Sequence, residues 1–244
     1  MKDDIREQVR RYVGEHPFLF FNFYRLRPRY RDLLVDRTTQ LVIEGFPRSG
    51  NTFAVVAFEQ AQRESVRIAH HLHMPAQVMR AARWRIPTLV LIRKPTDAVL
   101  SLVVRERRIS IRQAIKHYVS FYEKVAGYRS AFIVGSFEEV TQDYGAVLER
   151  VNARFGTRFS LFDHSTDNVE GVLSHIEERH RARREGELDE KRIARPSAVK
   201  AGMKESLMQE LQGPRVSELT ARAEAVYKDL VTASTVVPHS TVDE

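Results

Sequence analysis

Two patterns of apolar and polar positions alternate along residues 3–156. Short apolar runs, which are typical of buried parallel strands, occupy residues 40–44, 65–70, 88–92 and 130–138. Around them, apolar residues recur every three or four positions, which predicts helices over residues 3–14, 51–62, 75–85, 96–106, 111–128 and 144–156. Strands that alternate with helices predict a three-layer α/β fold, in which a central, mostly parallel sheet has helices on both faces.

Single residues mark several ends in this pattern. Thr96 is expected to cap the helix that follows the third apolar run. Gly156 is expected to end the helix before it, because glycine adopts the left-handed backbone of a helix C-terminus at little cost. The fourth strand is expected to end at Glu138.

The later part of the chain follows a different pattern. Residues 177–192 are almost all charged, with both signs mixed, and this predicts a helix that frays into a mobile, solvated segment. Helical spacing returns over residues 195–230. We therefore expect a single domain over residues 1–232, followed by a loose tail at residues 233–244.

An aromatic run, PFLFFNFY, occupies residues 17–24. It is far shorter than the roughly 20 apolar residues that cross a bilayer, so no transmembrane segment is expected. The favoured interpretation is a segment packed onto the core. Contact with a membrane interface and the lining of an apolar acceptor pocket are the alternatives. No secretory signal is expected from the charged residues with which the sequence begins.

Composition narrows the classes of function. The chain of 244 residues has no cysteine, which excludes disulfides and zinc–thiolate sites and suits a cytoplasmic protein. Its net charge of +7 favours anionic partners such as nucleotides, nucleic acid, sulfated glycans or a lipid surface, and the alternative is a solvated surface with extra arginine. A nucleic-acid partner is not expected, because the charged segment mixes both signs and no nucleic-acid-binding module is recognisable.

The stretch LVIEGFPRSGNTFAVVAF, residues 41–58, predicts a strand, a tight loop and a helix. Gly45 and Gly50 occupy the two glycine positions of a phosphate loop and Thr52 its hydroxyl position, whereas Asn51 replaces its lysine. Backbone amides at the helix start, with the positive end of the helix dipole, form an anion site. The alternative is an ordinary tight turn.

The charge of this predicted site differs from that of a nucleotide triphosphate site. Arg48 offers a planar guanidinium from within the loop. No aspartate or glutamate follows the second or third apolar run, where a metal ligand of such enzymes is expected. The sequence therefore favours an anion that binds without a metal ion.

A second anion site is predicted at the same edge of the sheet. Arg93 stands where the third apolar run ends, and Ser101 follows eight residues later in the next helix. The carboxyl ends of parallel strands share one edge, which is where open α/β sheets bind ligands. Two neighbouring anion sites suit a nucleotide that is phosphorylated at both its 5′ and 3′ ends.

These two stretches resemble a known family. FPRSGNTF resembles the 5′-phosphosulfate loop of P-loop sulfotransferases, and IRKPTDAVLS resembles their 3′-phosphate motif. The resemblance covers residues 40–156 and departs from the family at Arg48, Asn51 and Phe53, which replace lysine, threonine and tryptophan. It implies the cofactor 3′-phosphoadenosine 5′-phosphosulfate (PAPS) and transfer of its sulfuryl group to a hydroxyl or amine.

The resemblance also implies roles for individual residues. The residues implied to hold the 5′ end are Arg48, Ser49, Gly50, Asn51, Thr52 and Phe53. Arg93 and Ser101 are implied to bind the 3′-phosphate, and Arg195 in RPSAVK is the further candidate for it.

Catalysis requires charge stabilisation and a base. Arg48 is expected to stabilise charge on the leaving oxygen. His70, His71 and His73 follow the second apolar run, and histidine is a suitable base near neutral pH. The resemblance aligns His71 with the family's base, while His73, His70 or a carboxylate are the alternatives. A metal site built from the three histidines is not favoured, because no acidic residue or cysteine accompanies them.

Two other classes of function compete with this hypothesis. The first is a P-loop kinase of a nucleotide or small metabolite, and the second is a non-enzymatic basic protein that binds polyanions. The acceptor is expected to be a small molecule, a carbohydrate or a lipid-linked compound, with the aromatic run as the hint of an apolar one. Peripheral contact with a membrane is compatible with each hypothesis.

Overall fold

The computed structural model describes residues 2–106, 108–182 and 207–235. Its centre is a four-stranded sheet in which every strand pair is parallel, in the order β2-β1-β3-β4. The strands are β1 (Leu41–Gly45), β2 (Ile68–His70), β3 (Thr88–Ile92) and β4 (Ile133–Ser136). This arrangement confirms the predicted α/β fold with a central parallel sheet.

The strand order contains a topological switch point. The chain leaves β1 toward β2 on one side and then crosses to β3 on the other side of β1. Gly45 pairs with Leu91 near the carboxyl ends of β1 and β3. The connections that follow these two strands diverge here, and open α/β sheets bind ligands in the resulting crevice.

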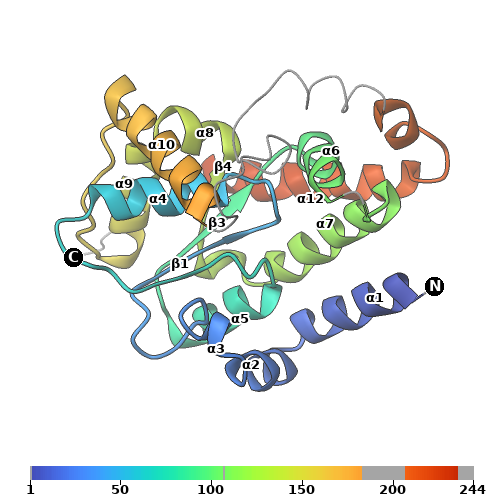
Figure 1. The fold of residues 1–244 in the computed structure, drawn as a ribbon, viewed down its shortest axis with the longest axis horizontal. Coiled ribbons are helices and arrows are strands. Elements are labelled where there is room, and N and C mark those ends of the chain that lie inside the picture. The colour runs from blue at the N-terminus through green and yellow to red at the C-terminus, as the bar shows by residue number, and fades with distance from the viewer. Residues whose placement is uncertain (1, 107, 183–206, 236–244) are drawn as a thin grey trace, which may run out of the picture.

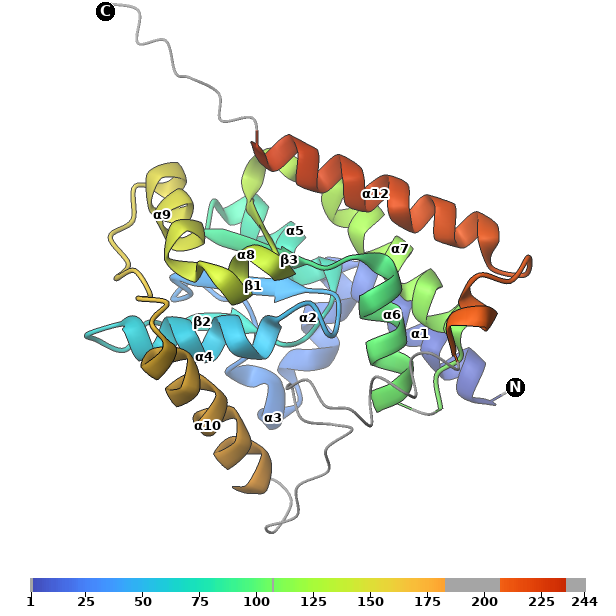
Figure 2. The ribbon, with the colours of Figure 1, turned by 90° about the horizontal axis from the view of Figure 1, so that it is seen from above.

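Helices cover both faces of the sheet (Figures 1 and 2). On one face, Leu41, Ile43 and Leu89 pack against α4 (Asn51–Ala61), α9 (Tyr144–Phe155) and α10 (Thr166–Ala182). On the other face, Val90 and Ile92 pack against further helices. These are α5 (Pro75–Trp84), α6 (Pro95–Arg105), α7 (Ile111–Ala126) and α12 (Ser217–Thr235). Alternate strand residues therefore serve opposite faces, as the pleat requires.

Three further helices precede the sheet and lie along the lower edge of Figure 1. They are α1 (Lys2–Glu15), α2 (Pro17–Arg25) and α3 (Pro28–Arg31). Phe20 and Phe21 of α2 are buried against Val42, Ala69 and α5. The predicted packing of the aromatic run onto the core is thus correct for these two residues. Within the described ranges, no helix combines the length and apolarity needed to span a bilayer.

Several element ends differ from the expectation. β2 begins at Ile68 and β4 at Ile133, each three residues later than predicted. The residue that precedes the first turn of α6 is Lys94, and not the expected cap Thr96. Pro95 occupies the first helical position, where its fixed φ and missing N–H cost nothing. β4 ends at Ser136 and not at Glu138. Ser136 and Glu139 form a reciprocal capping box that begins the short helix α8 (Phe137–Gln142).

The other ends agree in part with the expectation. Gly156 ends α9 in the left-handed conformation, as predicted. A 3₁₀ turn, Arg129–Ala131, leads into β4. The helix α12 continues to Thr235, beyond the expected start of the tail. Of the charged segment 177–192, the first six residues belong to α10; the remainder, Arg195 and residues 236–244 lie outside the described residues.

Candidate active site at the carboxyl edge of the sheet

The connection between β1 and α4 has the shape of an anion loop. Gly50 adopts φ 89° immediately before α4, and Arg48 adopts φ 74° although it is not glycine. A Cβ on Gly45 would lie 2.3 Å from the carbonyl oxygen of Leu91, so no side chain fits there. The first amides of α4 have no partner within the helix, and the helix dipole places positive charge at the same point.

Tyr122 of α7 holds this loop in place. Its hydroxyl accepts the Phe46 N–H at 3.2 Å, donates to the Leu91 carbonyl at 2.7 Å, and lies 3.3 Å from the Ser49 hydroxyl. Ser49 is fully buried, and its N–H donates to the Phe46 carbonyl. The hydroxyl and the N–H of Ser49 therefore both help to hold the loop in this conformation.

Asn51 occupies the position of the phosphate-loop lysine and points inward. Its Nδ2 donates to the Phe46 carbonyl at 3.0 Å, and the residue is buried. Phe53, two residues later, is also buried and packs against Phe162 and His164. The Asn51 and Phe53 side chains fix the loop and carry no charge. Positive charge for an anion site must therefore come from other residues.

The charge comes from two arginines that converge on the loop. Arg48 Nε donates to the Ser101 hydroxyl at 3.0 Å, and Arg93 Nη1 donates to the Arg48 carbonyl at 3.3 Å. The Arg93 guanidinium lies 3.8 Å from the centre of the Phe137 ring, at the start of α8. The two sequence motifs, one after β1 and one after β3, therefore meet, with Ser101 bonded to Arg48 and not to Arg93.

The carboxylates whose charges act on this pair are Asp97 and Glu138 for Arg93 and Glu106 for Arg48, and none of them forms an ion pair with either arginine among the described residues. Burial, followed by the neighbouring charges of Arg105 and Arg93, lowers the pKa of Arg48 to about 10. Within residues 2–106, 108–182 and 207–235, no carboxylate lies within ion-pair distance of Arg48 or Arg93. The Arg93 Nε is buried and has no hydrogen-bond partner in the described chain. A desolvated, unpaired cation is costly unless an anion binds beside it.

The histidine segment after β2 reaches the same place. His71 Nε2 lies 3.2 Å from the Thr52 hydroxyl in the first turn of α4, and its Nδ1 lies 2.6 Å from Nδ1 of His70. His71 and His73 adopt φ 60° and 54°. Of the four non-glycine residues described with positive φ, three (Arg48, His71 and His73) thus surround this edge of the sheet. Such backbone strain is typical of functional sites.

Glu44, inside β1, fixes the position of the histidine segment. Its two carboxylate oxygens accept the N–H groups of Leu72 and His73, each at 2.9 Å. Complete burial raises the pKa of Glu44 to about 7. This carboxylate is committed to the backbone and is not exposed to the site.

The tautomer of His73 follows from its surroundings. Its Nδ1 lies 2.8 Å from the Gly45 carbonyl oxygen, which accepts only, so Nδ1 carries the proton. Burial lowers the pKa of His73 to about 4, and the ring is therefore neutral at pH 7. Its 3.9 Å approach to Glu44 is accordingly no ion pair, and Nε2 retains its lone pair.

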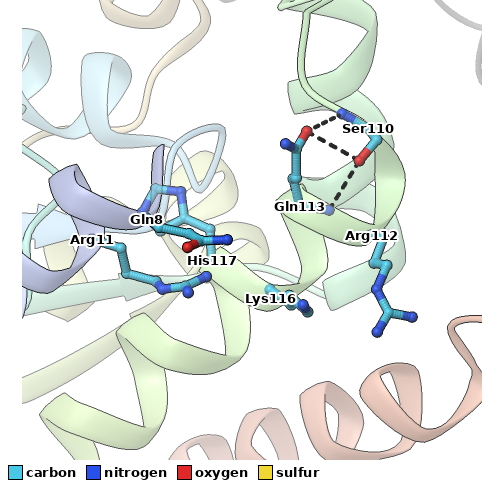
Figure 3. A pocket seen from close by; sticks show the side chains of 7 residues that line it. All are labelled: Gln8, Arg11, Ser110, Arg112, Gln113, Lys116 and His117. Carbon is cyan, nitrogen blue, oxygen red and sulfur yellow. Dashed lines mark hydrogen bonds between the residues drawn. The ribbon is translucent and has the colours of Figure 1, made fainter. Parts of the chain in front are cut away.

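A basic hollow of about 240 Å³ borders the site between α1 and α7 (Figure 3). Gln8 and Arg11 from α1 face the residues of α7 and its cap across it. The α7 side is formed by Ser110, Arg112, Gln113, Lys116 and His117. His117 connects the hollow to the site, because its ring centroid lies 5.2 Å from that of Phe46 in the loop.

Sequence reasoning missed Glu44, Tyr122 and Phe137. An acidic residue inside an apolar strand run, and tyrosines on the apolar side of a helix, are the signals that were present, since buried polar groups need partners. The candidate Arg195 lies outside the described residues. No cluster of three metal-ligating side chains occurs in the part of the chain that the structure describes.

Comparisons with known proteins give little further help. No family model matches the chain, and no curated protein does so either. Among solved structures, the crystal structure of mouse sulfotransferase SULT7A1 complexed with PAP is similar, with 12% identity and a TM-score of 0.42. The match covers 81% of this chain and 91% of that chain. At this level the similarity carries no weight for function, which has to be inferred from the site.

Proposed function

We propose that this protein is a PAPS-dependent sulfotransferase. The observation that carries the proposal is the convergence of Arg48, Ser101 and Arg93 at the switch point, without a carboxylate in ion-pair contact among the described residues. Desolvated guanidinium groups beside a helix N-terminus suit a ligand with two anionic ends. The resemblance of both motifs to those of sulfotransferases supports PAPS as that ligand.

Under this proposal, different residues would bind the two ends of PAPS and stabilise the charge that develops during transfer. When bound, PAPS supplies a sulfuryl group, whose bond to the phosphate oxygen breaks as a bond to the acceptor oxygen or nitrogen forms. Arg48 and the amides of Gly50 and Thr52 would hold the 5′ end and stabilise charge on the departing oxygen. Arg93 would bind the 3′-phosphate. Ser101, through its bond to Arg48, would couple the two subsites.

The acceptor must lose a proton during transfer, and we assign that proton to His71. Its Nε2 lies beside Thr52, in the turn that would hold the sulfuryl donor. His73 is the second candidate, because its Nε2 is unprotonated at neutral pH. The carboxylate of Glu44 is not a candidate, since both its oxygens accept backbone N–H groups.

A P-loop kinase is the less favoured function. The side chain in the lysine position, Asn51, is turned into the loop. Glu44 is the nearest acidic residue in sequence to the loop, and its burial leaves it unable to hold Mg²⁺ for a bound nucleotide.

Calorimetric titration tests the proposal directly. We expect the chain to bind 3′,5′-adenosine bisphosphate more tightly than 5′-AMP, without Mg²⁺. Arg93→Ala should weaken the bisphosphate roughly 10- to 100-fold, the equivalent of one charge-assisted contact, and 5′-AMP much less. Arg63→Ala, an exposed arginine beyond α4, is the matched control and should change neither affinity.

The same titration separates the alternatives. Mg²⁺-dependent binding of ATP in preference to the bisphosphate would favour the kinase. If Arg93→Ala lowered the affinities for 3′,5′-adenosine bisphosphate and 5′-AMP equally, the assignment of Arg93 to the 3′-phosphate would be contradicted. Affinity without nucleotide preference that falls steeply with salt would indicate a polyanion-binding protein.

The base assignment needs a measurement of turnover. His71→Ala should reduce acceptor-dependent release of 3′,5′-adenosine bisphosphate from PAPS by at least about 100-fold while affinity for the bisphosphate stays nearly unchanged. The assay would use a panel of phenol, amine and carbohydrate acceptors. His73→Ala serves as the comparison, and the larger loss in that variant would move the base to His73.

A further inference from the structure

Exposed apolar side chains are concentrated in one part of this molecule. Of the seven large apolar residues that are exposed in the described structure, six lie between Val9 and Leu26. The seventh, Leu161, belongs to the segment between α9 and α10. Soluble proteins scatter such residues singly, so a concentration of this kind marks an interaction surface.

The helix α2 carries four of the six. Phe18 is 76% exposed, Leu19 41%, Phe23 46% and the capping residue Leu26 80%. Residues four or eight positions apart lie on the same side of a helix. Phe18 and Leu26 therefore form one row along α2, and Leu19 and Phe23 form the neighbouring row. The opposite side of α2, with Phe20, is buried in the core.

A helix that is apolar on both sides normally lies inside a protein or in a membrane. One side of α2 is buried in the protein, and at the start of the helix Phe18 borders a hollow that α5 also lines. The exposed side chains lie on the other side of α2, a helix that Figure 1 shows at the lower edge of the molecule.

Positive charge accompanies this apolar side. Arg25, Arg27, Arg29 and Arg31 alternate along the sequence that leaves α2, and all four are exposed. The Arg27 guanidinium lies 4.1 Å from the centre of the Phe23 ring, and that of Arg29 lies 4.5 Å from Tyr30. Between residues 16 and 31 the chain contains no acidic residue.

We propose that this surface, the α2 patch, docks onto an anionic lipid bilayer. The patch consists of Phe18, Leu19, Phe23 and Leu26 with Arg25, Arg27, Arg29 and Arg31. Apolar side chains on a short helix enter the boundary between headgroups and acyl chains, while arginines beside them bind lipid phosphates and carboxylates. Arg27, stacked on Phe23, places a guanidinium group beside the exposed apolar side chains, which is the chemistry that such a boundary recognises.

The charge of the patch selects the bilayer over another protein copy as its occupant. A second copy would bring the same four arginines to the same surface, and like charges would oppose a symmetric contact. An anionic lipid surface neutralises them instead. The docking would be peripheral, and it is independent of the sulfotransferase proposal.

Vesicle co-sedimentation of the full chain tests the docking. We expect binding to vesicles with about one quarter phosphatidylserine in phosphatidylcholine, little binding to pure phosphatidylcholine, and weakening as salt rises. The triple variant Phe18→Ser/Phe23→Ser/Leu26→Ser should reduce the partition constant at least about tenfold, because it removes the inserting groups. Leu161→Ser is the matched control and should bind like the unmodified chain.

A second variant separates the two parts of the patch. Arg25→Gln/Arg27→Gln/Arg29→Gln/Arg31→Gln should abolish the preference for phosphatidylserine. Circular dichroism should report unchanged folding in both variants, since the altered side chains are exposed. The absence of vesicle binding by the unmodified chain, or unchanged binding by the triple variant, would overturn the proposal. So would a dimer in size-exclusion chromatography that the triple variant abolishes while vesicle binding persists.

Discussion

At the scale of single residues, the site is defined by backbone conformations that its side chains do not favour. Arg48, His71 and His73 all have positive φ, a region that costs a non-glycine residue about 1 kcal/mol. Arg48 adds the cost of a buried charge beside Arg93. Folding tolerates such residues because long-range contacts fix the loops, and under the proposed function each is a position where function would oppose stability.

This opposition predicts the behaviour of Arg48→Gly. Glycine relieves the positive φ and the charge repulsion, so we expect the variant to melt at the same or a higher temperature than the unmodified chain. Affinity for 3′,5′-adenosine bisphosphate should fall at least about tenfold. Thermal denaturation and calorimetric titration give the two readouts.

Arg85→Gly is the matched control for Arg48→Gly. Arg85 also has positive φ, 56°, but it is an exposed cap at the end of α5. We expect the same direction of stability change and no change in nucleotide affinity. Loss of affinity in both variants, or in neither, would show that Arg48 has no particular role in binding.

At the scale of elements, one tyrosine joins three of them. Tyr122 of α7 contacts the β1–α4 loop through Phe46 and Ser49, and contacts β3 through Leu91. Glu44 does the same for β1 and the histidine segment. Buried polar groups inside the protein, which would not touch a ligand, therefore hold together the elements that carry the two motifs.

Replacing Tyr122 by phenylalanine tests this coupling. The change leaves the Phe46 N–H without its acceptor and removes the donor to Leu91, so we expect a loss of about 2–3 kcal/mol in the free energy of unfolding. Tyr144→Phe is the matched control. The Tyr144 hydroxyl is equally buried but has no partner within the described residues, so its removal should be neutral or stabilising. Urea denaturation of both variants gives the comparison.

At the scale of the whole molecule, buried titratable groups predict how stability varies with pH. Burial lowers the pKa of His117 to about 3 and that of His73 to about 4, whereas unfolding restores both toward 6.5. The unfolded chain then binds more protons between these values, so stability falls as pH drops below 6.5. Glu44 acts in the opposite direction, because its pKa is raised to about 7 and its contribution is lost as pH rises.

Two histidines outweigh one glutamate, so we expect the chain to be less stable at about pH 5 than at about pH 7.5. His117→Gln should make this loss smaller, and Glu44→Gln should make it larger. Urea denaturation at both pH values measures the difference. Unchanged pH dependence in both variants would mean that these groups titrate alike in the folded and unfolded chain.

The sequence by itself determined the two motifs and many of the elements, although not the helices α2, α3 and α8. Periodicity is a local property, and β1, β3, α4 and α7 begin within a residue or so of where it predicted them. Because parallel strands share a carboxyl edge, the strand pattern then predicts that the Arg48 and Arg93 motifs lie near one another. The predicted ends were wrong at Lys94 and Ser136, because each of these helix starts depends on a single capping residue. The periodicity of apolar residues does not show which of several neighbouring residues takes the capping position.

Only the tertiary structure decided which distant residues hold the site in place and which side chains surround it. The bond between Phe46 and Tyr122 spans 76 residues, and that between Glu44 and Leu72 spans 28. No local pattern encodes such contacts, because they arise from the way the helices pack on the sheet. The same packing buried Phe20 and left Phe18 exposed on α2, a division that an almost uniformly apolar run could not specify. Local periodicity therefore fixes the elements, whereas the partners of buried polar groups and the exposed side of an apolar helix are set by the assembled fold.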